Sequence, residues 1–92
     1  MIKSFKHKGL EKFYLTDSKA GIIPAHAEKL RDQLTALAFA ESAGDMNRQG
    51  WRLHALTGKF QGQWSVRVNG NWRLTFRFIG PNAEVVDYQD YH

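Results

Sequence analysis

Two arginines flank an Asn-Gly turn in the stretch VRVNGNWRLTF, residues 66–76. Guanidinium groups bind phosphate oxygens through paired N–H donors, so Arg67 and Arg73 could hold one anion between them if the stretch folds as a hairpin. The alternative is that each arginine extends into water or pairs with Asp87 or Asp90. That alternative suits a single arginine, whereas two arginines on one polar face favour anion binding.

Side chains able to transfer protons in RNA cleavage are concentrated in the second half of the chain. Cleavage without a metal needs a base for the 2′-hydroxyl proton, an acid for the leaving oxygen and cations for the charge on the phosphorane. The candidates for proton transfer are His54, Asp90, Tyr91 and His92, and Lys59 could be a further cation. A lone strand histidine is more often structural, so this inventory alone does not establish an enzyme. No histidine pair has metal-ligand spacing, and no phosphate loop, nucleophile elbow or dinucleotide motif is present, so we expect neither metal nor cofactor.

The charge distribution also points to an anionic partner. The chain has 92 residues, 13 Lys and Arg against 9 Asp and Glu, a net charge of +4 and no cysteine. In residues 48–92, six basic residues, five of them arginine, stand against three acidic ones. Nucleic acid is one explanation and a solubilising surface charge is the other. We expect one domain over residues 1–92, with no disulfide, signal peptide or membrane-spanning stretch, and a cytoplasmic protein.

Helical spacing dominates the first half of the chain. We expect a helix at His7–Leu15 and a second helix that Pro24 opens in its first turn. The apolar stripe of the second helix is Ala27, Leu30, Leu34 and Leu37. A break at residues 42–45 ends this helix, and His7 and His26 are expected at the surface.

From Trp51 onward the apolar residues alternate with polar ones instead. Short strands are expected at Ile2–Phe5, Arg52–Leu56, Gln63–Val68, Trp72–Ile79 and Ala83–Tyr88. Helices followed by hairpin-connected strands predict an α+β fold, with two N-terminal helices packed on one face of a twisted, mainly antiparallel β-sheet.

The apolar pattern of the hairpin selects its register. Its core-facing side chains are expected to be Trp64, Val66, Val68, Trp72, Leu74, Phe76 and Phe78. A two-residue loop would mix charged and apolar side chains on both faces, whereas a three-residue loop at 69–71, with a bulge, sets Val68 opposite Trp72 and Arg67 opposite Arg73. The polar face then also pairs Ser65 with Thr75 and Gln63 with Arg77, which makes Arg77 a further phosphate-binding candidate. Like charges directly opposite cost roughly 0.2–1 kcal/mol, so a bound anion would explain the arginine pair.

Strict alternation along the last strand separates the C-terminal residues. It places Asp90 and His92 on the core face and Gln89 and Tyr91 on the arginine face. Only a bend after Tyr88 would redirect them, and the sequence shows none.

The chain resembles the HigB toxins, a branch of the RelE/ParE superfamily of bacterial toxin–antitoxin systems. The similarity runs nearly end to end and lies in the blocks IKSFKHKGLEKFY, NRQGWRLHALTG, WSVRVNGNWRLTFRF and VVDYQDYH. The resemblance implies a single toxin domain with the small RelE-like α+β fold. It also implies a ribosome-dependent, metal-independent endoribonuclease that cleaves mRNA in the ribosomal A site and so inhibits translation.

The resemblance also implies roles for individual residues. The motif positions are His54, Arg67, Arg73, Asp90, Tyr91 and His92. Arg73 would stabilise the scissile phosphate, and the other arginine would grip the RNA. His92 would transfer a proton, with Asp90 orienting it or sharing the role, while His54 and Tyr91 would position the substrate or assist.

One departure from the family pattern and two alternative functions stay open. Thr57 stands where some members have lysine, and Lys59 could replace it. ParE-type members share the fold but inhibit DNA gyrase without cleaving RNA, and a non-toxic RNA-binding module is a third reading. The terminal Asp-Tyr-His, with His54, favours the enzyme. The implied partners are the ribosome, mRNA and a HigA-type helix-turn-helix antitoxin. Contact with operator DNA would come mainly from the antitoxin.

Overall fold

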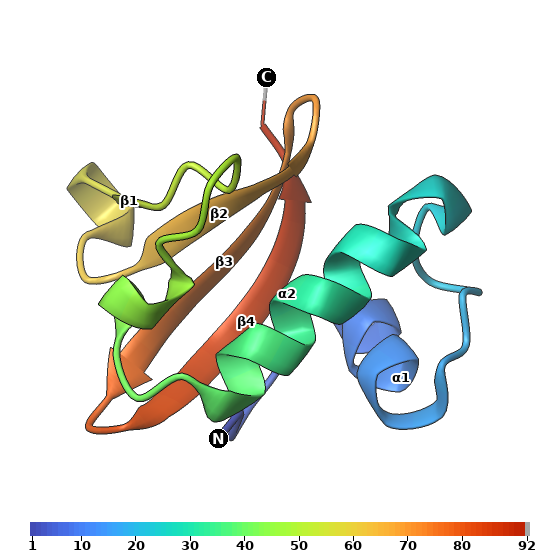
Figure 1. Cartoon of the computed structure of the whole chain (residues 1–92), viewed down its shortest axis with the longest axis horizontal. Coiled ribbons are helices and arrows are strands. Elements are labelled where there is room, and N and C mark those ends of the chain that lie inside the picture. The colour runs from blue at the N-terminus through green and yellow to red at the C-terminus, as the bar shows by residue number, and fades with distance from the viewer. Residues whose placement is uncertain (92) are drawn as a thin grey trace.

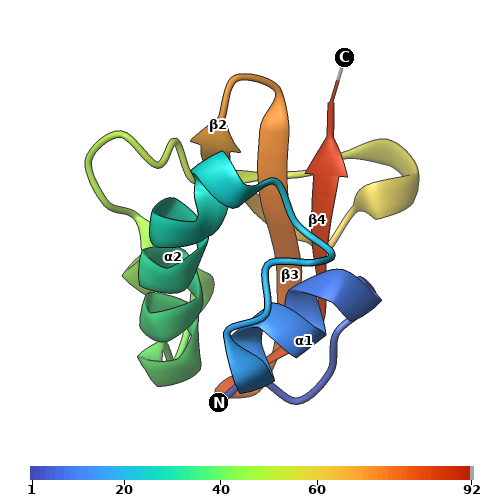
Figure 2. The ribbon, with the colours of Figure 1, turned by 90° about the vertical axis from the view of Figure 1, so that its right-hand side faces the viewer.

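Two helices cover one face of a four-stranded antiparallel sheet in a computed structural model that describes residues 1–91 (Figures 1 and 2). The helices are α1 (Lys8–Thr16) and α2 (Ala27–Phe39), with the 3₁₀ turns η1 (Pro24–His26), η2 (Ala43–Met46) and η3 (Gly58–Phe60). The strands are β1 (His54–Ala55), β2 (Trp64–Asn69), β3 (Trp72–Ile79) and β4 (Asn82–Asp90), paired in that order. The predicted α+β fold is therefore confirmed. Within the described part of the chain, no helix has the length and apolar character needed to cross a membrane.

Helix α1 begins and ends with side-chain and backbone caps. The Nδ1 atom of His7 accepts a hydrogen bond from the Leu10 N–H at 2.9 Å, satisfying one of the free amides of the first turn. At the other end, Asp17 adopts a left-handed conformation and its N–H donates to the Phe13 carbonyl. Leu10 and Phe13 are buried, so α1 presents one apolar side to the core. His7 was expected at the surface, but it is half-buried because its ring forms this cap.

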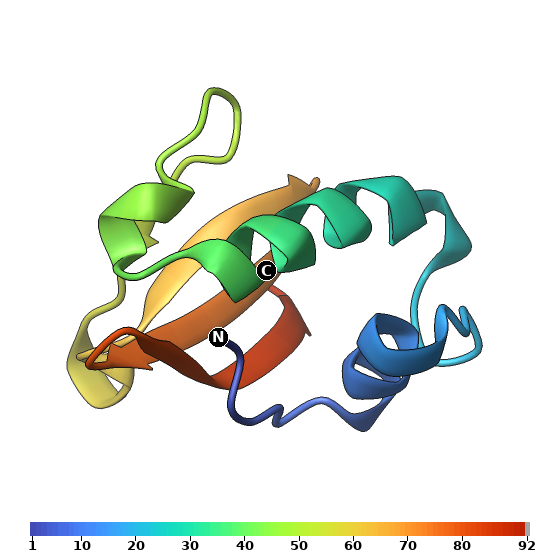
Figure 3. The ribbon, with the colours of Figure 1, turned by 60° about the horizontal axis from the view of Figure 1, so that its bottom comes forward.

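Helix α2 crosses the sheet and carries most of the helical core (Figure 3). Pro24 opens the 3₁₀ turn that leads into it, as its fixed φ favours. The predicted stripe of Leu30, Leu34 and Leu37 is buried. The helix ends at Phe39, and the expected break contains η2 rather than a loop.

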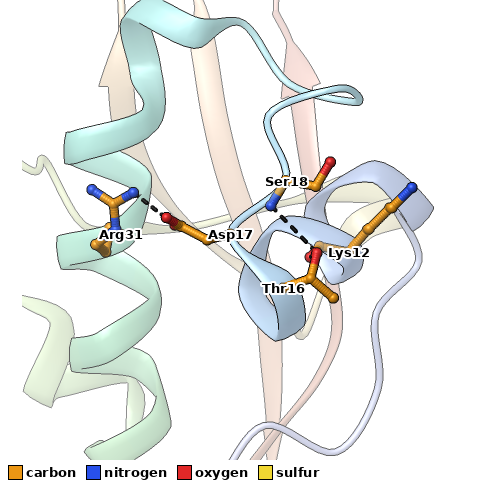
Figure 4. Close-up of polar contacts among 5 residues, drawn as sticks. All are labelled: Lys12, Thr16, Asp17, Ser18 and Arg31. Carbon is orange, nitrogen blue, oxygen red and sulfur yellow. Dashed lines mark hydrogen bonds and ion pairs between the residues drawn. The ribbon is translucent and has the colours of Figure 1, made fainter.

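An ion pair at the surface links α2 to the residue that follows α1 (Figure 4). Arg31 Nη2 of α2 lies 2.7 Å from Asp17 Oδ1, just after α1. The Thr16 hydroxyl donates to the Lys12 carbonyl and accepts from the Ser18 N–H, which closes the last turn of α1. The ion pair is exposed, so it orients this corner more than it stabilises it.

The β2–β3 hairpin has the predicted register along most of its length. Arg67 lies opposite Arg73, and the neighbouring expected pairs Ser65–Thr75, Val66–Leu74 and Trp64–Phe76 all form. One detail was wrong, because Asn69 and not Val68 lies opposite Trp72. The extra residue is accommodated by a bulge inside β2 instead of in the loop, which leaves a two-residue loop with Gly70 at φ 57°. Four of the expected core side chains are buried, and Trp64, Trp72 and Phe78 pack against them partly exposed.

A second bulge lies between β3 and β4. The register shifts between Thr75 and Arg77, where Val85 adopts φ 50°, an uncommon value for a β-branched residue. The Val85 N–H donates to Ser4 Oγ at 2.9 Å. The segment expected as a strand at Ile2–Phe5 instead makes two isolated parallel bridges with β4, because it meets that strand at its bulge.

Candidate functional site

Two rows of polar side chains run across the face of the sheet that α1 and α2 leave uncovered. Directly paired residues in neighbouring strands project to the same side, roughly 4.5–5.5 Å apart. The histidine row contains His54, Ser65, Thr75 and Asp87, one from each strand. The arginine row contains Arg67, Arg73 and Gln89. The face therefore brings together cations, a histidine and hydrogen-bonding groups that are far apart in the sequence.

The arginine row is held in place by backbone contacts. The Arg67 N–H donates to the Trp51 carbonyl at 2.6 Å, and its own carbonyl accepts from Gln33 Nε2 at 2.8 Å. Arg73 Nη1 donates to the carbonyls of Gly70 at 2.9 Å and Trp72 at 3.2 Å, so its guanidinium is drawn towards the turn.

Neither arginine of the row is neutralised by a carboxylate among residues 1–91, where the ion pair is Arg31–Asp17. The expected alternative partner Asp87 accepts instead from the Tyr88 N–H and from Gln89 Nε2, both at 2.9 Å. Two half-buried arginines directly opposite each other on neighbouring strands repel each other unless an anion lies between them. This part of the sheet is therefore suited to bind a phosphate.

His54 presents a defined tautomer in the histidine row. Its Nδ1 lies 3.0 Å from the Arg52 carbonyl, which can only accept, so in the neutral ring Nδ1 carries the proton. Its Nε2 then accepts from the Ser65 hydroxyl at 3.3 Å. The imidazole is exposed while Ser65 is fully buried, so the ring stands over an ordered hydroxyl with an unprotonated nitrogen.

Two of the three C-terminal candidates, Asp90 and Tyr91, lie within the described structure. Asp90 pairs with Trp72, so it projects to the side opposite Arg73, as alternation predicted. The Tyr91 N–H donates to the Asn71 carbonyl at 2.8 Å, which ties the end of the chain to the β2–β3 loop, and its Oη is buried without a hydrogen bond in the described structure. Figure 1 shows this end of β4 beside the loop. The candidate His92 lies outside the described residues.

The two outlying cations do not join the rows. Lys59 is exposed in η3, before β2 begins, and its Nζ lies 5.3 Å from the centre of the Phe60 ring. Arg77 is exposed and pairs with Glu84 beyond the second bulge, about 13 Å along β3 from Arg73 at the usual rise per residue. Both stay candidates for contact with a longer RNA.

Asp87, Gln89, Ser65 and Thr75 were not identified as functional from the sequence. Alternation placed Ser65, Thr75 and Gln89 on the polar face, but their hydrogen bonds depend on side-chain geometry. Ser65 and Thr75 are fully buried beneath the longer side chains of the face. They serve as fixed hydrogen-bonding partners for His54 and Gln89.

A buried aromatic cluster supports the sheet from behind the arginine row. His26 was expected at the surface, but only 5% of it is exposed, and its Nδ1 lies 2.6 Å from Tyr88 Oη. Trp72 stacks on Tyr88 with ring centres 4.5 Å apart. Burial lowers the pKa of His26 and raises the pKa of Tyr88, with a backbone hydrogen bond at Ile23 opposing the latter. Both shifts favour the neutral forms of the phenol and the imidazole that share this hydrogen bond.

Within residues 1–91, no group of three or more His, Asp or Glu side chains is arranged to hold a metal ion. The geometry thus defines a small α+β protein with a cationic, hydrogen-bonding sheet face.

Comparisons with known proteins agree with this description. The family model for the RelE-like toxin of the type II toxin–antitoxin system HigB matches residues 3–92. Over 92 residues the chain is 42% identical to Endoribonuclease HigB of Proteus vulgaris, covering 100% of both chains. It is 36% identical over 81 residues to Toxin HigB-1 of Vibrio cholerae serotype O1, covering 86% of this chain and 85% of the relative. The chain belongs to the HigB-like family of type II toxin–antitoxin toxins, and this membership implies an antitoxin partner.

Proposed function

We propose that this toxin is an endoribonuclease that cleaves mRNA in the ribosomal A site without a bound metal and thereby stops translation in the cytoplasm. The observation that carries the proposal is the Arg67–Arg73 pair, which lies on one face without a neutralising carboxylate among the described residues. The name of its relative, Endoribonuclease HigB, supports RNA as the substrate.

The chemistry follows from the groups on and beside the arginine face. The 2′-oxygen bonds to the adjacent phosphorus as it loses its proton, and the bond to the 5′-oxygen breaks as that oxygen gains one. Arg73 stabilises the charge that develops on the phosphorane, and Arg67 binds the RNA backbone. We assign proton transfer to His92 and the orienting of that residue to Asp90, whose side chain projects to the side opposite Arg73, while His54 and Tyr91 position the substrate or assist. Lys59 and Arg77 contact flanking phosphates.

The antitoxin is proposed to be of the HigA type, a helix-turn-helix protein through which operator DNA is mainly bound. Electrophoretic mobility shift of operator DNA should then require the antitoxin, with the toxin alone giving no shift.

Cleavage of mRNA on programmed ribosomes tests the enzymatic proposal. Wild-type toxin should cut the message within the A-site codon, whereas free message should stay intact. Intact ribosome-bound message together with loss of gyrase supercoiling activity would instead support a ParE-like inhibitor. If the message stays intact, gyrase supercoiling activity is unchanged and the protein still binds RNA, the result would support a non-toxic RNA-binding module.

A further inference from the structure

Gln89 occupies the third position of the arginine row. It lies directly opposite Arg73 in the β3–β4 pair and is half-buried. A phosphate held between Arg67 and Arg73 would therefore have Gln89 roughly one strand spacing, about 5 Å, further along the row. An adjacent ribose or base comes within reach of its side chain.

The amide of Gln89 is held in one orientation by two acceptors. Its Nε2 donates to Asp87 Oδ2 at 2.9 Å and to Thr75 Oγ1 at 3.2 Å. An ionised carboxylate only accepts hydrogen bonds, so Asp87 excludes the flipped amide. Asp87 is itself fixed by the Tyr88 N–H at 2.9 Å. Thr75 is fully buried, so this pair of acceptors forms a rigid support.

The remaining polar atom of Gln89 is then available to a ligand. Both amide hydrogens are engaged on the side of the histidine row, so Oε1 points away from that row. Within residues 1–91, no hydrogen bond to Oε1 is formed, and Oε1 is not among the buried polar atoms that lack a partner. A pre-oriented acceptor beside a pair of phosphate-binding cations is suited to recognise a donor on the same nucleotide strand.

We propose that Gln89 is a substrate-contacting residue whose Oε1 accepts a hydrogen bond from the nucleotide next to the bound phosphate, either from a ribose 2′-hydroxyl or from a base amino group. The assignment rests on the proposed function, since it takes RNA as the ligand. Asp87 and Thr75 are positioning residues that act through the Gln89 amide.

The test compares Gln89→Leu with wild type on programmed ribosomes. One hydrogen bond of this kind contributes about 0.5–1.5 kcal/mol, so the toxin concentration giving half-maximal single-turnover cleavage should rise about two- to tenfold. The maximal rate should fall less than this, because Gln89 binds substrate and is not assigned a proton. Gln61→Leu, at an exposed glutamine before β2, is the matched control and should behave as wild type.

Two modified messages identify the donor through equilibrium binding. On an uncleavable codon lacking 2′-hydroxyls, wild type and Gln89→Leu should bind equally if ribose is the contact. If a base is the contact, the variant should stay weaker on that codon, and the difference should vanish when the base amino group is replaced by hydrogen. Binding and cleavage equal to wild type on the unmodified message would overturn the proposal.

The positioning role has its own readout. Asp87→Asn lets the Gln89 amide flip, so binding should weaken, yet adding this change to Gln89→Leu should weaken it no further. Additive losses would contradict action through Gln89. Should wild type leave the message uncut, the proposed function fails, while the binding comparison still decides the role of Gln89.

Discussion

Gln33 and Arg67 are joined by a hydrogen bond that crosses from helix α2 to the arginine row. Gln33 is fully buried, and its Nε2 lies 2.8 Å from the Arg67 carbonyl oxygen. Its Oε1 is buried without a hydrogen-bond partner. An unpaired buried acceptor costs about 1–3 kcal/mol of folding stability. Gln33 therefore fixes the position of β2, but its unpaired Oε1 makes the core less stable.

Replacing Gln33 with methionine should change stability little. The change removes the unpaired Oε1 but leaves the Arg67 carbonyl without its donor, and the two effects are of similar size, so we expect a shift of at most about 1–2 kcal/mol. Leu34→Ala, at the next position of α2, should cost about 2–5 kcal/mol because it leaves a cavity. Urea unfolding of both variants measures the change in the free energy of unfolding. If Gln33→Met destabilises the protein as much as Leu34→Ala does, the lost hydrogen bond to the Arg67 carbonyl outweighs the removal of the unpaired Oε1.

Arg73→Ala should abolish growth inhibition when the toxin is expressed, with near-normal thermal unfolding. Among residues 1–91 the side chain donates to the carbonyls of Gly70 and Trp72, so the fold loses little, whereas charge stabilisation at the phosphate is removed. Arg73→Lys restores a point charge without the bidentate geometry and should recover only part of the activity. Arg77→Ala should be milder because Arg77 lies outside both rows. Full toxicity of Arg73→Ala at wild-type expression would refute the assigned role.

Deletion of His92 should slow cleavage more than it weakens ribosome binding, since the residue is proposed to transfer a proton. Single-turnover rates and equilibrium binding, measured on the same programmed ribosomes, separate the two effects. Equal losses in rate and affinity would reduce His92 to a binding residue.

Gly9→Ala should destabilise the fold by about 1–3 kcal/mol through overpacking. A Cβ at Gly9 would lie 2.6 Å from the Gly21 carbonyl oxygen and 2.7 Å from the Gly21 Cα, and both contacts are with backbone. Gly44→Ala is the control, because its nearest neighbour would be the Ser42 hydroxyl at 3.8 Å. Circular dichroism melts of the two variants give the comparison, and similar melting temperatures would mean that the chain between α1 and η1 shifts freely.

Stability should fall as the pH drops below about 6.5, in part because of His26. Burial lowers the pKa of His26 in the folded state, so the unfolded chain binds more protons at low pH. Stability contributed by the neutral ring is therefore present above the unfolded pKa and decreases as the pH falls, by at most about 1.4 kcal/mol per pH unit for one proton. His26→Gln should flatten this dependence in urea unfolding at pH 5–7. An unchanged slope would assign the effect to other groups.

The hairpin shows how far the sequence alone could go. Alternating apolar residues determine which side chains face the core, and that was enough to set Arg67 opposite Arg73. The bulge position was missed because either Val68 or the loop can absorb the extra residue, and backbone geometry decides between them. The burial of His26 was missed for a different reason, since its partner Tyr88 lies 62 positions away in the chain.

The candidate functional residues also fall into those that the sequence indicates and those that depend on three-dimensional contacts. Arginines and histidines were proposed as site residues from their residue types, whereas Gln89 was placed on the arginine face without a role. Its significance depends on Asp87 and Thr75 holding the amide, and no spacing rule reports that orientation.

The first residues of the chain cover the outer edge of β4. Hydrogen bonds join Lys3 and Lys6 to the carbonyls of Ala83 and Val86, and the N–H groups of these two β4 residues donate back to Met1 and Ser4. Without this segment, the outer edge of β4 would offer unpaired backbone groups to any extended chain nearby. The N-terminal segment therefore guards against edge-to-edge aggregation, and shortening it should lower solubility before it affects the arginine face.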